Sequence, residues 1–207
     1  ETTYMFSPKV LDRAHVIEIT SNNPSTYFEE TGDHSLDIEQ DAVELLAKFE
    51  QSIRRRSQGT EGTSISFFKD SLSEEIKNEV LDQVKSVLES LYTLLKPVGF
   101  DFGYRVVSEV LDYLATSRQI FADADLVWFL DRVVLQKVLP KIHGNKRQLG
   151  ECLQAMESYL SGAAGSYIWG NTTIQVAAPP FPLNQSRDKV QRMRLRMDAI
   201  GYTSYIT

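Results

Sequence analysis

Cysteine and histidine, the residues from which disulfides and most metal centres are built, are scarce in this sequence. The 207 residues include one cysteine, Cys152, and three histidines at distant positions, His15, His34 and His143. One thiol forms no internal disulfide, and four scattered ligands of this kind make no zinc cage. We therefore expect neither a redox centre nor a metal site in this chain.

Long apolar runs are missing as well. No stretch of 18 or more uncharged apolar residues occurs, which disfavours a membrane-spanning helix, and the polar start Glu1-Thr2-Thr3 does not fit a signal peptide. Acidic residues outnumber basic ones by 28 to 22, and the formal charge of −6 argues against nucleic-acid binding through the whole surface. An apolar share of 42% provides a core for one ordinary domain or two small ones. We expect a cytoplasmic protein without a membrane partner.

The signatures of common catalytic sites are absent too. The sequence has no Gly-x-x-x-x-Gly-Lys-Ser/Thr loop, no His-Glu-x-x-His and no Gly-x-Ser-x-Gly, and no carboxylate pair stands out from the acidic surface. A free-standing enzyme is therefore disfavoured, and the chain alone is not expected to hydrolyse nucleotide. Because the first residue is not methionine, we interpret the chain as a piece of a longer polypeptide that supplies the missing parts of a site.

Hydrophobic spacing predicts a mainly α-helical fold. Apolar residues recur every three to four positions along several segments, as they do on one face of a helix. Ser71 and Glu74 have the spacing of a capping box for the longest helix, and Pro97 ends it. The segment 57–66, rich in Gly, Ser and Thr, is expected to be an exposed loop. The predicted helices cover residues 35–56, 71–95, 104–116, 123–138, 145–160 and a last segment from 186.

A few short strands are expected beside these helices. Ser7 and Pro8 suit the start of a short opening helix, which leads into an apolar alternation over 15–19 that is typical of a strand. Residues 167–169 and 173–176 have the composition of two short strands that pair with each other. The sequence thus predicts a mainly α protein with a few short strands near its C-terminus.

Two arginines stand in settings that suggest a function. Arg13 comes at the C-terminal end of the opening helix, where a long cation can project beyond the domain or simply interact with the helix dipole. Arg105 comes at the start of a helix, just after Gly103, which is the unfavourable end of the dipole for a cation. The placement of Arg105 calls for an anionic partner, either a ligand or a neighbouring Asp101 or Glu109 in a surface salt bridge.

Basic and aromatic residues raise a nucleic-acid hypothesis. Basic side chains gather around one helix end and along the last helix, where they can contact phosphates or form ordinary helix surfaces. Trp128 and Phe129 are expected in the core or in interdomain packing, whereas Trp169 beside Gly170 fits a partner surface. Cys152, on an apolar helix face, is expected to be buried. The basic residues are Lys137, Lys141, His143, Lys146, Arg147, Arg187, Lys189, Arg192, Arg194 and Arg196.

Two segments resemble sequence motifs of a known protein family. The chain opens with Glu-Thr-Thr-Tyr-Met-Phe-Ser-Pro-Lys-Val-Leu-Asp-Arg-Ala and continues into His-Val-Ile-Glu-Ile, and residues 102–111 read Phe-Gly-Tyr-Arg-Val-Val-Ser-Glu-Val-Leu. The opening segment resembles the short helix, arginine finger and last core strand of McrB-type and MoxR-like AAA+ ATPases. Residues 102–111 resemble the helix of their lid domain that carries the sensor 2 arginine. The further segments that resemble the lid and C-terminal end of that family are 123–126, 134–144, 181–183, 189–193 and 201–205.

The resemblance implies a division of the chain and roles for both arginines. Residues 1–34 would form the end of an α/β nucleotide-binding core with a linker, 35–144 a helical lid with an insertion at about 54–70, and 145–207 a C-terminal extension. Arg13 would be a catalytic arginine finger that acts in trans on nucleotide bound to the neighbouring subunit. Arg105 would contact the phosphates of nucleotide bound to its own subunit.

The activity that the resemblance implies belongs to the longer protein. That protein would hydrolyse ATP or GTP with Mg²⁺, assemble into a homo-oligomeric ring, and remodel a partner such as a nuclease or DNA in restriction or defence. The chain itself, without Walker motifs, is expected to be inactive and to hold no cofactor. The alternative is a non-enzymatic helical module that docks on a protein or on DNA.

Overall fold

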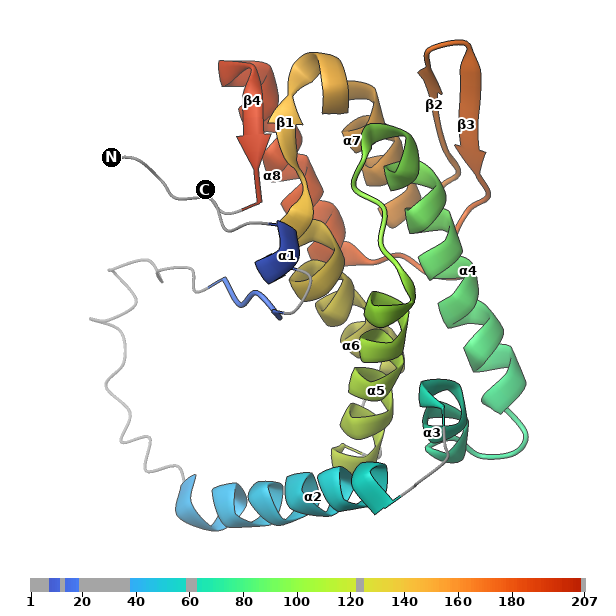
Figure 1. Cartoon of the computed structure of the whole chain (residues 1–207), viewed down its shortest axis with the longest axis vertical. Coiled ribbons are helices and arrows are strands. Elements are labelled where there is room, and N and C mark those ends of the chain that lie inside the picture. Colours follow the sequence, from blue (N-terminus) through green and yellow to red (C-terminus); the bar gives the residue numbers. More distant parts are fainter. Residues whose placement is uncertain (1–7, 12–13, 19–37, 59–62, 122–124, 206–207) are drawn as a thin grey trace.

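The computed structural model describes residues 8–11, 14–18, 38–58, 63–121 and 125–205 of the chain. Helices form the body of the molecule, and two small sheets, both formed by residues after 142, lie at one end of it (Figure 1). This confirms the predicted mainly α fold with short strands. The helices are α1 (Pro8–Leu11), α2 (Ile38–Gln58), α3 (Ser64–Asp70), α4 (Lys77–Leu95), α5 (Tyr104–Ile120), α6 (Leu126–Val133), α7 (Lys146–Leu160) and α8 (Asn184–Ile200), with short helical turns η2 (Lys96–Val98), η3 (Val134–Val138) and η4 (Leu139–Lys141).

Each of the two sheets is an antiparallel pair. In one hairpin, β2 (Gly165–Trp169) pairs with β3 (Thr172–Val176), as the sequence predicts, and Gly170 in its turn has a φ of 60°, which favours glycine. In the other sheet, β1 (His143–Asn145) pairs with β4 (Tyr202–Ser204), which brings the last strand beside the start of α7. The second pair was not predicted, because three residues are too few to show an alternating pattern.

One hydrophobic core joins the helices from α4 to α8. Leu91, Leu114, Leu130, Leu153 and Val190, one from each helix, are at most 1% exposed and belong to the same cluster of buried side chains. Residues on both sides of the expected boundary at 144 and 145 therefore share a core. The division into a lid and a C-terminal extension stays a prediction. None of the helices in the described ranges is long and apolar enough to cross a lipid bilayer.

The predicted capping box at the start of the long helix is wrong. Helix α4 begins at Lys77, and its N-cap residue Ile76 makes no side-chain cap. Ser71 instead follows the end of α3, and its hydroxyl donates to the carbonyl of Phe68 at 2.6 Å. The sequence pattern is misleading because α3, part of which lies in the expected loop 57–66, ends where a new helix was expected to start.

The predicted strand over 15–19 is also wrong within the described residues. Residues 14–18 form no strand, and Ile19 lies outside the described ranges. The backbone amide of Val16 donates to the carbonyl of Gln136 at 2.9 Å. A strand needs a neighbouring strand for its ladder, and this segment lies against η3 instead.

Candidate functional site

Of the two candidate arginines, the structure describes only one. Arg13 lies outside the described residues. Arg105 lies in the first turn of α5, and its side chain is exposed. It forms no ion pair or hydrogen bond with any other described residue. Neither of the alternative salt bridges, with Asp101 or with Glu109, is formed, and Glu109 pairs instead with the buried ammonium group of Lys137.

The start of α5 is an open helix end. The N-cap residue Gly103 has extended backbone angles, and no side chain caps the first N–H groups. Unpaired N–H groups and the helix dipole make such an end favourable for an anion. Arg105 adds a full positive charge at the same place. No carboxylate of the described residues pairs with Arg105 or caps this helix end, so it can accept an anion from outside.

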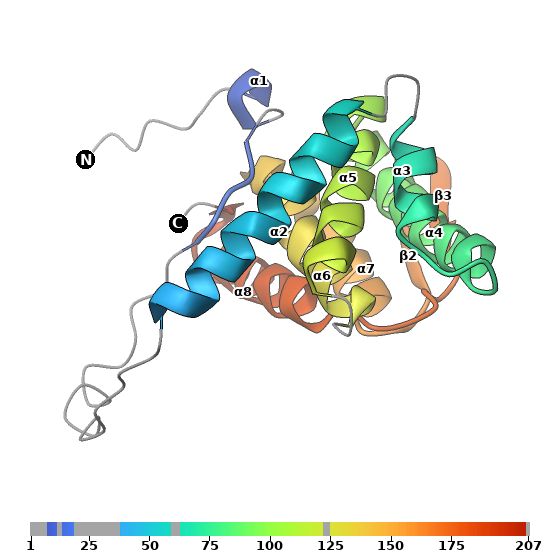
Figure 2. The same ribbon diagram turned by 90° about the horizontal axis from the view of Figure 1, so that it is seen from below.

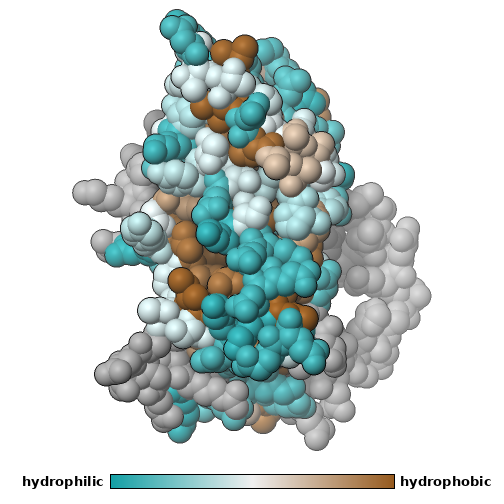
Figure 3. Space-filling model, turned by 90° about the vertical axis from the view of Figure 1, so that its right-hand side faces the viewer, coloured by the Kyte–Doolittle hydropathy of each residue, from teal (hydrophilic) through white to brown (hydrophobic). Residues whose placement is uncertain are grey.

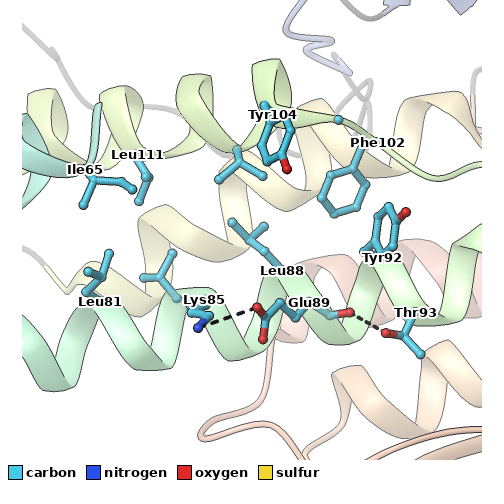
Figure 4. A pocket seen from close by; sticks show the side chains of 13 residues that line it. Ile65, Leu81, Lys85, Leu88, Glu89, Tyr92, Thr93, Phe102, Tyr104 and Leu111 are labelled. Atoms are coloured by element: carbon cyan, nitrogen blue, oxygen red, sulfur yellow. Dashed lines mark hydrogen bonds and ion pairs between the residues drawn. The ribbon is translucent and has the colours of Figure 1, made fainter. Parts of the chain in front are cut away.

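An apolar groove begins at this helix end. It has a volume of about 750 Å³, and side chains of α3, α4 and α5 line it. In Figure 4, Tyr92, Phe102 and Tyr104 gather at one end of the groove, whereas Ile65 and Leu81 lie at the other. Tyr104 is 95% exposed, and the ring of Phe102 meets that of Tyr92 edge-on. The molecular surface on the α4 side shows apolar areas between larger hydrophilic ones (Figure 3).

A second hollow lies between α7, the β2–β3 hairpin and α8, with a volume of about 990 Å³. Lys146 pairs there with Asp198 at 2.7 Å, and Arg194 pairs with Glu157 at 2.6 Å. Two of its cations are therefore neutralised by carboxylates. Arg147, in the first turn of α7, is exposed and forms no ion pair with the described residues.

Three of the lysines in the nucleic-acid hypothesis are buried. Lys137 and Lys189 are 1% and 4% exposed, and Lys141 is 8% exposed. Lys137 bonds to Glu109 and also donates to the carbonyl of Ala14 at 3.2 Å. These three lysines are too buried to offer their charges to a phosphate backbone, so they do not support the nucleic-acid hypothesis.

Buried ammonium groups instead fasten the segment 14–18. Lys189 on α8 donates to both carboxylate oxygens of Glu18 at 2.7 Å, and its ammonium group lies 4.3 Å from the centre of the Tyr205 ring. With the bonds of Lys137, they hold the segment against η3 and α8. Sequence reasoning missed this role, because Glu18 and Lys189 are far apart in the chain.

The expectations for the aromatic residues and the cysteine are confirmed in part. Phe129 is buried, but Trp128 is 45% exposed, with the guanidinium group of Arg132 4.7 Å from its ring centre. Cys152 is buried, and its thiol donates to the carbonyl of Leu94 at 3.4 Å. Burial raises the pKa of Cys152 to about 12. This cysteine is a packed side chain and not a nucleophile.

Magnesium is expected only with the nucleotide of the longer protein. Within the ranges that the structure covers, no group of three or more His, Cys, Asp or Glu residues is placed to hold a metal. Mg²⁺ is bound by carboxylates together with substrate phosphates. We therefore assign no residue of this chain as a magnesium ligand.

Comparison with known protein families places most of the chain in one family. The model of a family described as a domain of unknown function, DUF8727, matches residues 31–202. Because the match covers most of the chain, the chain belongs to this family. No curated protein and no solved structure matches it.

Proposed function

We propose that this member of the DUF8727 family is the lid-side part of an AAA+ nucleoside triphosphatase, in which Arg105 contacts the phosphates of bound nucleotide. One observation carries the proposal: Arg105 is an exposed cation in the first turn of α5 and has no ion pair within the described chain. We compare this helix with the sensor 2 helix because the sequence of residues 102–111 resembles it.

The electrostatics of the helix end fit this role. A phosphate near the first turn would accept hydrogen bonds from the free N–H groups and meet the favourable end of the helix dipole. The guanidinium group of Arg105 would add two parallel N–H donors, a geometry that matches phosphate oxygens. A lid helix that binds phosphate in this way also follows the nucleotide state, because loss of the terminal phosphate removes the contact.

The remaining parts of the activity lie in a longer protein. The sequence has no phosphate-binding loop, so hydrolysis of ATP or GTP needs an additional domain, and the chain alone should be inactive. Arg13, just upstream of the fastened segment 14–18, is the proposed arginine finger that acts on the neighbouring subunit. The whole protein would be a cytoplasmic homo-oligomeric ring that remodels a nuclease partner or DNA.

The test is nucleotide turnover and affinity of the full-length protein, with ATP and GTP in parallel. Arg105→Ala should lower both turnover and nucleotide affinity, because Arg105 would contact the phosphates in the bound nucleotide and also during hydrolysis. Arg13→Ala should spare binding and reduce turnover roughly 10³- to 10⁵-fold, as loss of an arginine finger does. The matched control is Arg147→Ala, since Arg147 is also exposed and unpaired within the described chain, but stands in the first turn of a helix that Asn145 caps.

Two results would contradict the proposal at different points. If Arg105→Ala keeps wild-type turnover and nucleotide affinity, Arg105 does not contact nucleotide, and the AAA+ proposal then rests on Arg13 alone. Absence of turnover in the wild-type full-length protein would remove the AAA+ assignment itself.

The second candidate is a non-enzymatic interaction module. It is favoured by the β2–β3 hairpin, which projects beside α4 and α7 in Figure 1 and leaves Ile168 63% and Trp169 37% exposed. Apolar side chains at the end of a hairpin suit a protein partner. A full-length protein without turnover, whose binding to a partner is lost in Trp169→Ser, would establish this function.

A further inference from the structure

Segment 14–18 runs along the outside of the helical body (Figure 2). Val16 is partly buried and packs against the core, whereas Ile17 is 72% exposed. Hydrogen bonds supply much of the remaining attachment, among them the bond from the amide of Val16 to the carbonyl of Gln136 at 2.9 Å. A segment that buries few apolar side chains can open locally while the core of the molecule stays folded.

His15 lies in this segment beside the buried Lys137–Glu109 pair. Its ring stacks on that of Tyr113, with the ring centres 5.9 Å apart and the planes at 24°. The charges that act on the ring come from Lys137 of η3 and Glu109 of α5, and these two groups already bond to each other. A proton on His15 would therefore add a positive charge to a site whose two charges are balanced.

This environment keeps His15 neutral at neutral pH. Burial of the ring and, after it, the ammonium group of Lys137 lower the pKa of His15 below its ordinary value of 6.5, although Glu109 acts in the opposite direction. Release of the segment exposes the ring to water, where the pKa returns to about 6.5. The released form thus binds a proton more readily than the docked form. Docking is therefore strongest above about pH 6.5 and weakens as the pH falls below it.

The proton would act on the same ammonium group that holds the segment. Lys137 donates to the carbonyl of Ala14, the residue directly before His15, at 3.2 Å. The side chain of Lys137 is fully buried and bonded to Glu109, so it cannot turn away from a second positive charge. The repulsion is relieved when His15 leaves, and the backbone at Ala14 leaves with it.

We propose that segment 14–18 is a pH-sensitive latch, docked while His15 is neutral and released when a proton on its ring faces Lys137. Uptake of one proton drives the release, and no covalent bond changes. The inference does not depend on the proposed function. Because Arg13 directly precedes the latch in the sequence, release would loosen the attachment of the chain beside this arginine in the longer protein.

A second ion pair fastens the other end of the latch. Lys189 of α8 donates to both carboxylate oxygens of Glu18 at 2.7 Å, and its ammonium group lies 4.3 Å from the centre of the Tyr205 ring. Burial and the carboxylate of Glu18 raise the pKa of Tyr205 to about 12, so this tyrosine does not titrate near neutral pH. Glu18→Gln removes the carboxylate of the latch, and this variant should dock more weakly while keeping the dependence of docking on pH.

Hydrogen–deuterium exchange of the 207-residue chain at pH 7.5, 6.5 and 5.5 tests the latch. The readout is the protection of the Val16 amide, corrected for the intrinsic exchange rate at each pH. In the wild type it should fall several-fold, by no more than about tenfold per pH unit for one proton, while the amides of α7 keep their protection. His15→Phe keeps a ring against Tyr113 without a titratable nitrogen, and His15→Gln is a second neutral replacement. In both variants, protection at Val16 should be the same at every pH.

His143→Gln is the matched control, because His143 is a partly buried histidine of β1 whose ring meets that of Phe100 edge-on. This variant should lose protection at Val16 as the wild type does. Equal protection of the wild type at pH 7.5 and 5.5, or an equal loss in His15→Phe and His15→Gln, would overturn the proposal. A pH dependence that disappears in His143→Gln or in Glu18→Gln would overturn it as well, since the decisive proton would then bind elsewhere.

Discussion

The buried Lys137–Glu109 pair is expected to be a main source of stability for the segment 14–18. The side chain of Lys137 is fully buried and that of Glu109 is 33% exposed. The ammonium group also donates to the carbonyl of Ala14 at 3.2 Å. Lys137→Met keeps most of the apolar stem and removes the charge, so Glu109 loses its partner and the carbonyl loses its donor.

The expected loss follows from the burial of the two groups. Removal of one partner from a buried ion pair costs about 3–5 kcal/mol, because the other charge stays buried without compensation. Glu109 is one third exposed and recovers part of this from water, which leaves about 2–4 kcal/mol of unfolding free energy. The double variant Lys137→Met with Glu109→Gln carries neither charge and should lose less than the sum of the two single changes.

Urea unfolding of the wild type, the two single variants and the double variant gives the coupling energy of the pair. The same cycle on Lys85 and Glu89 is the control, because their side chains are 63% and 68% exposed and such pairs contribute about 0.5 kcal/mol or less. A coupling energy for Lys137 and Glu109 no larger than that of the exposed pair would refute the reasoning.

Two further predictions concern other buried groups. Asp131 accepts from the backbone amides of Gln185 and Ser186 at 2.8 and 2.9 Å and so caps α8; in urea unfolding, Asp131→Ala should cost about 2–3 kcal/mol. Asp125 caps α6 at an exposed position, so Asp125→Ala should lower the free energy of unfolding by only about 1 kcal/mol or less in the same assay. Equal losses for the two variants would contradict the argument that burial makes the Asp131 cap stronger. Cys152, with a pKa raised to about 12 by burial, should resist a disulfide reagent at pH 8 in the folded chain and react once urea unfolds it. Fast labelling of the native protein would show that the thiol is accessible.

The long helices could be predicted from the sequence because their signal is local. Apolar residues spaced along α4, α5, α7 and α8 face one core, and the spacing survives whatever the helices pack against. The β2–β3 hairpin was also predicted, since its two strands are neighbours in the chain. The start of α5 near Arg105 was placed to the residue, because a glycine loop precedes it.

What the sequence did not reveal depends on distant partners. Strand β1 pairs with β4 more than fifty residues later, and neither has a pattern of its own. The burial of Lys189 depends on Glu18, so a lysine on a basic helix was interpreted as a solvent-facing charge. Leu45, Phe49 and Ile53 of α2 have the spacing of one helix face and are nevertheless 41%, 48% and 51% exposed. Local spacing does not indicate whether an apolar face is covered.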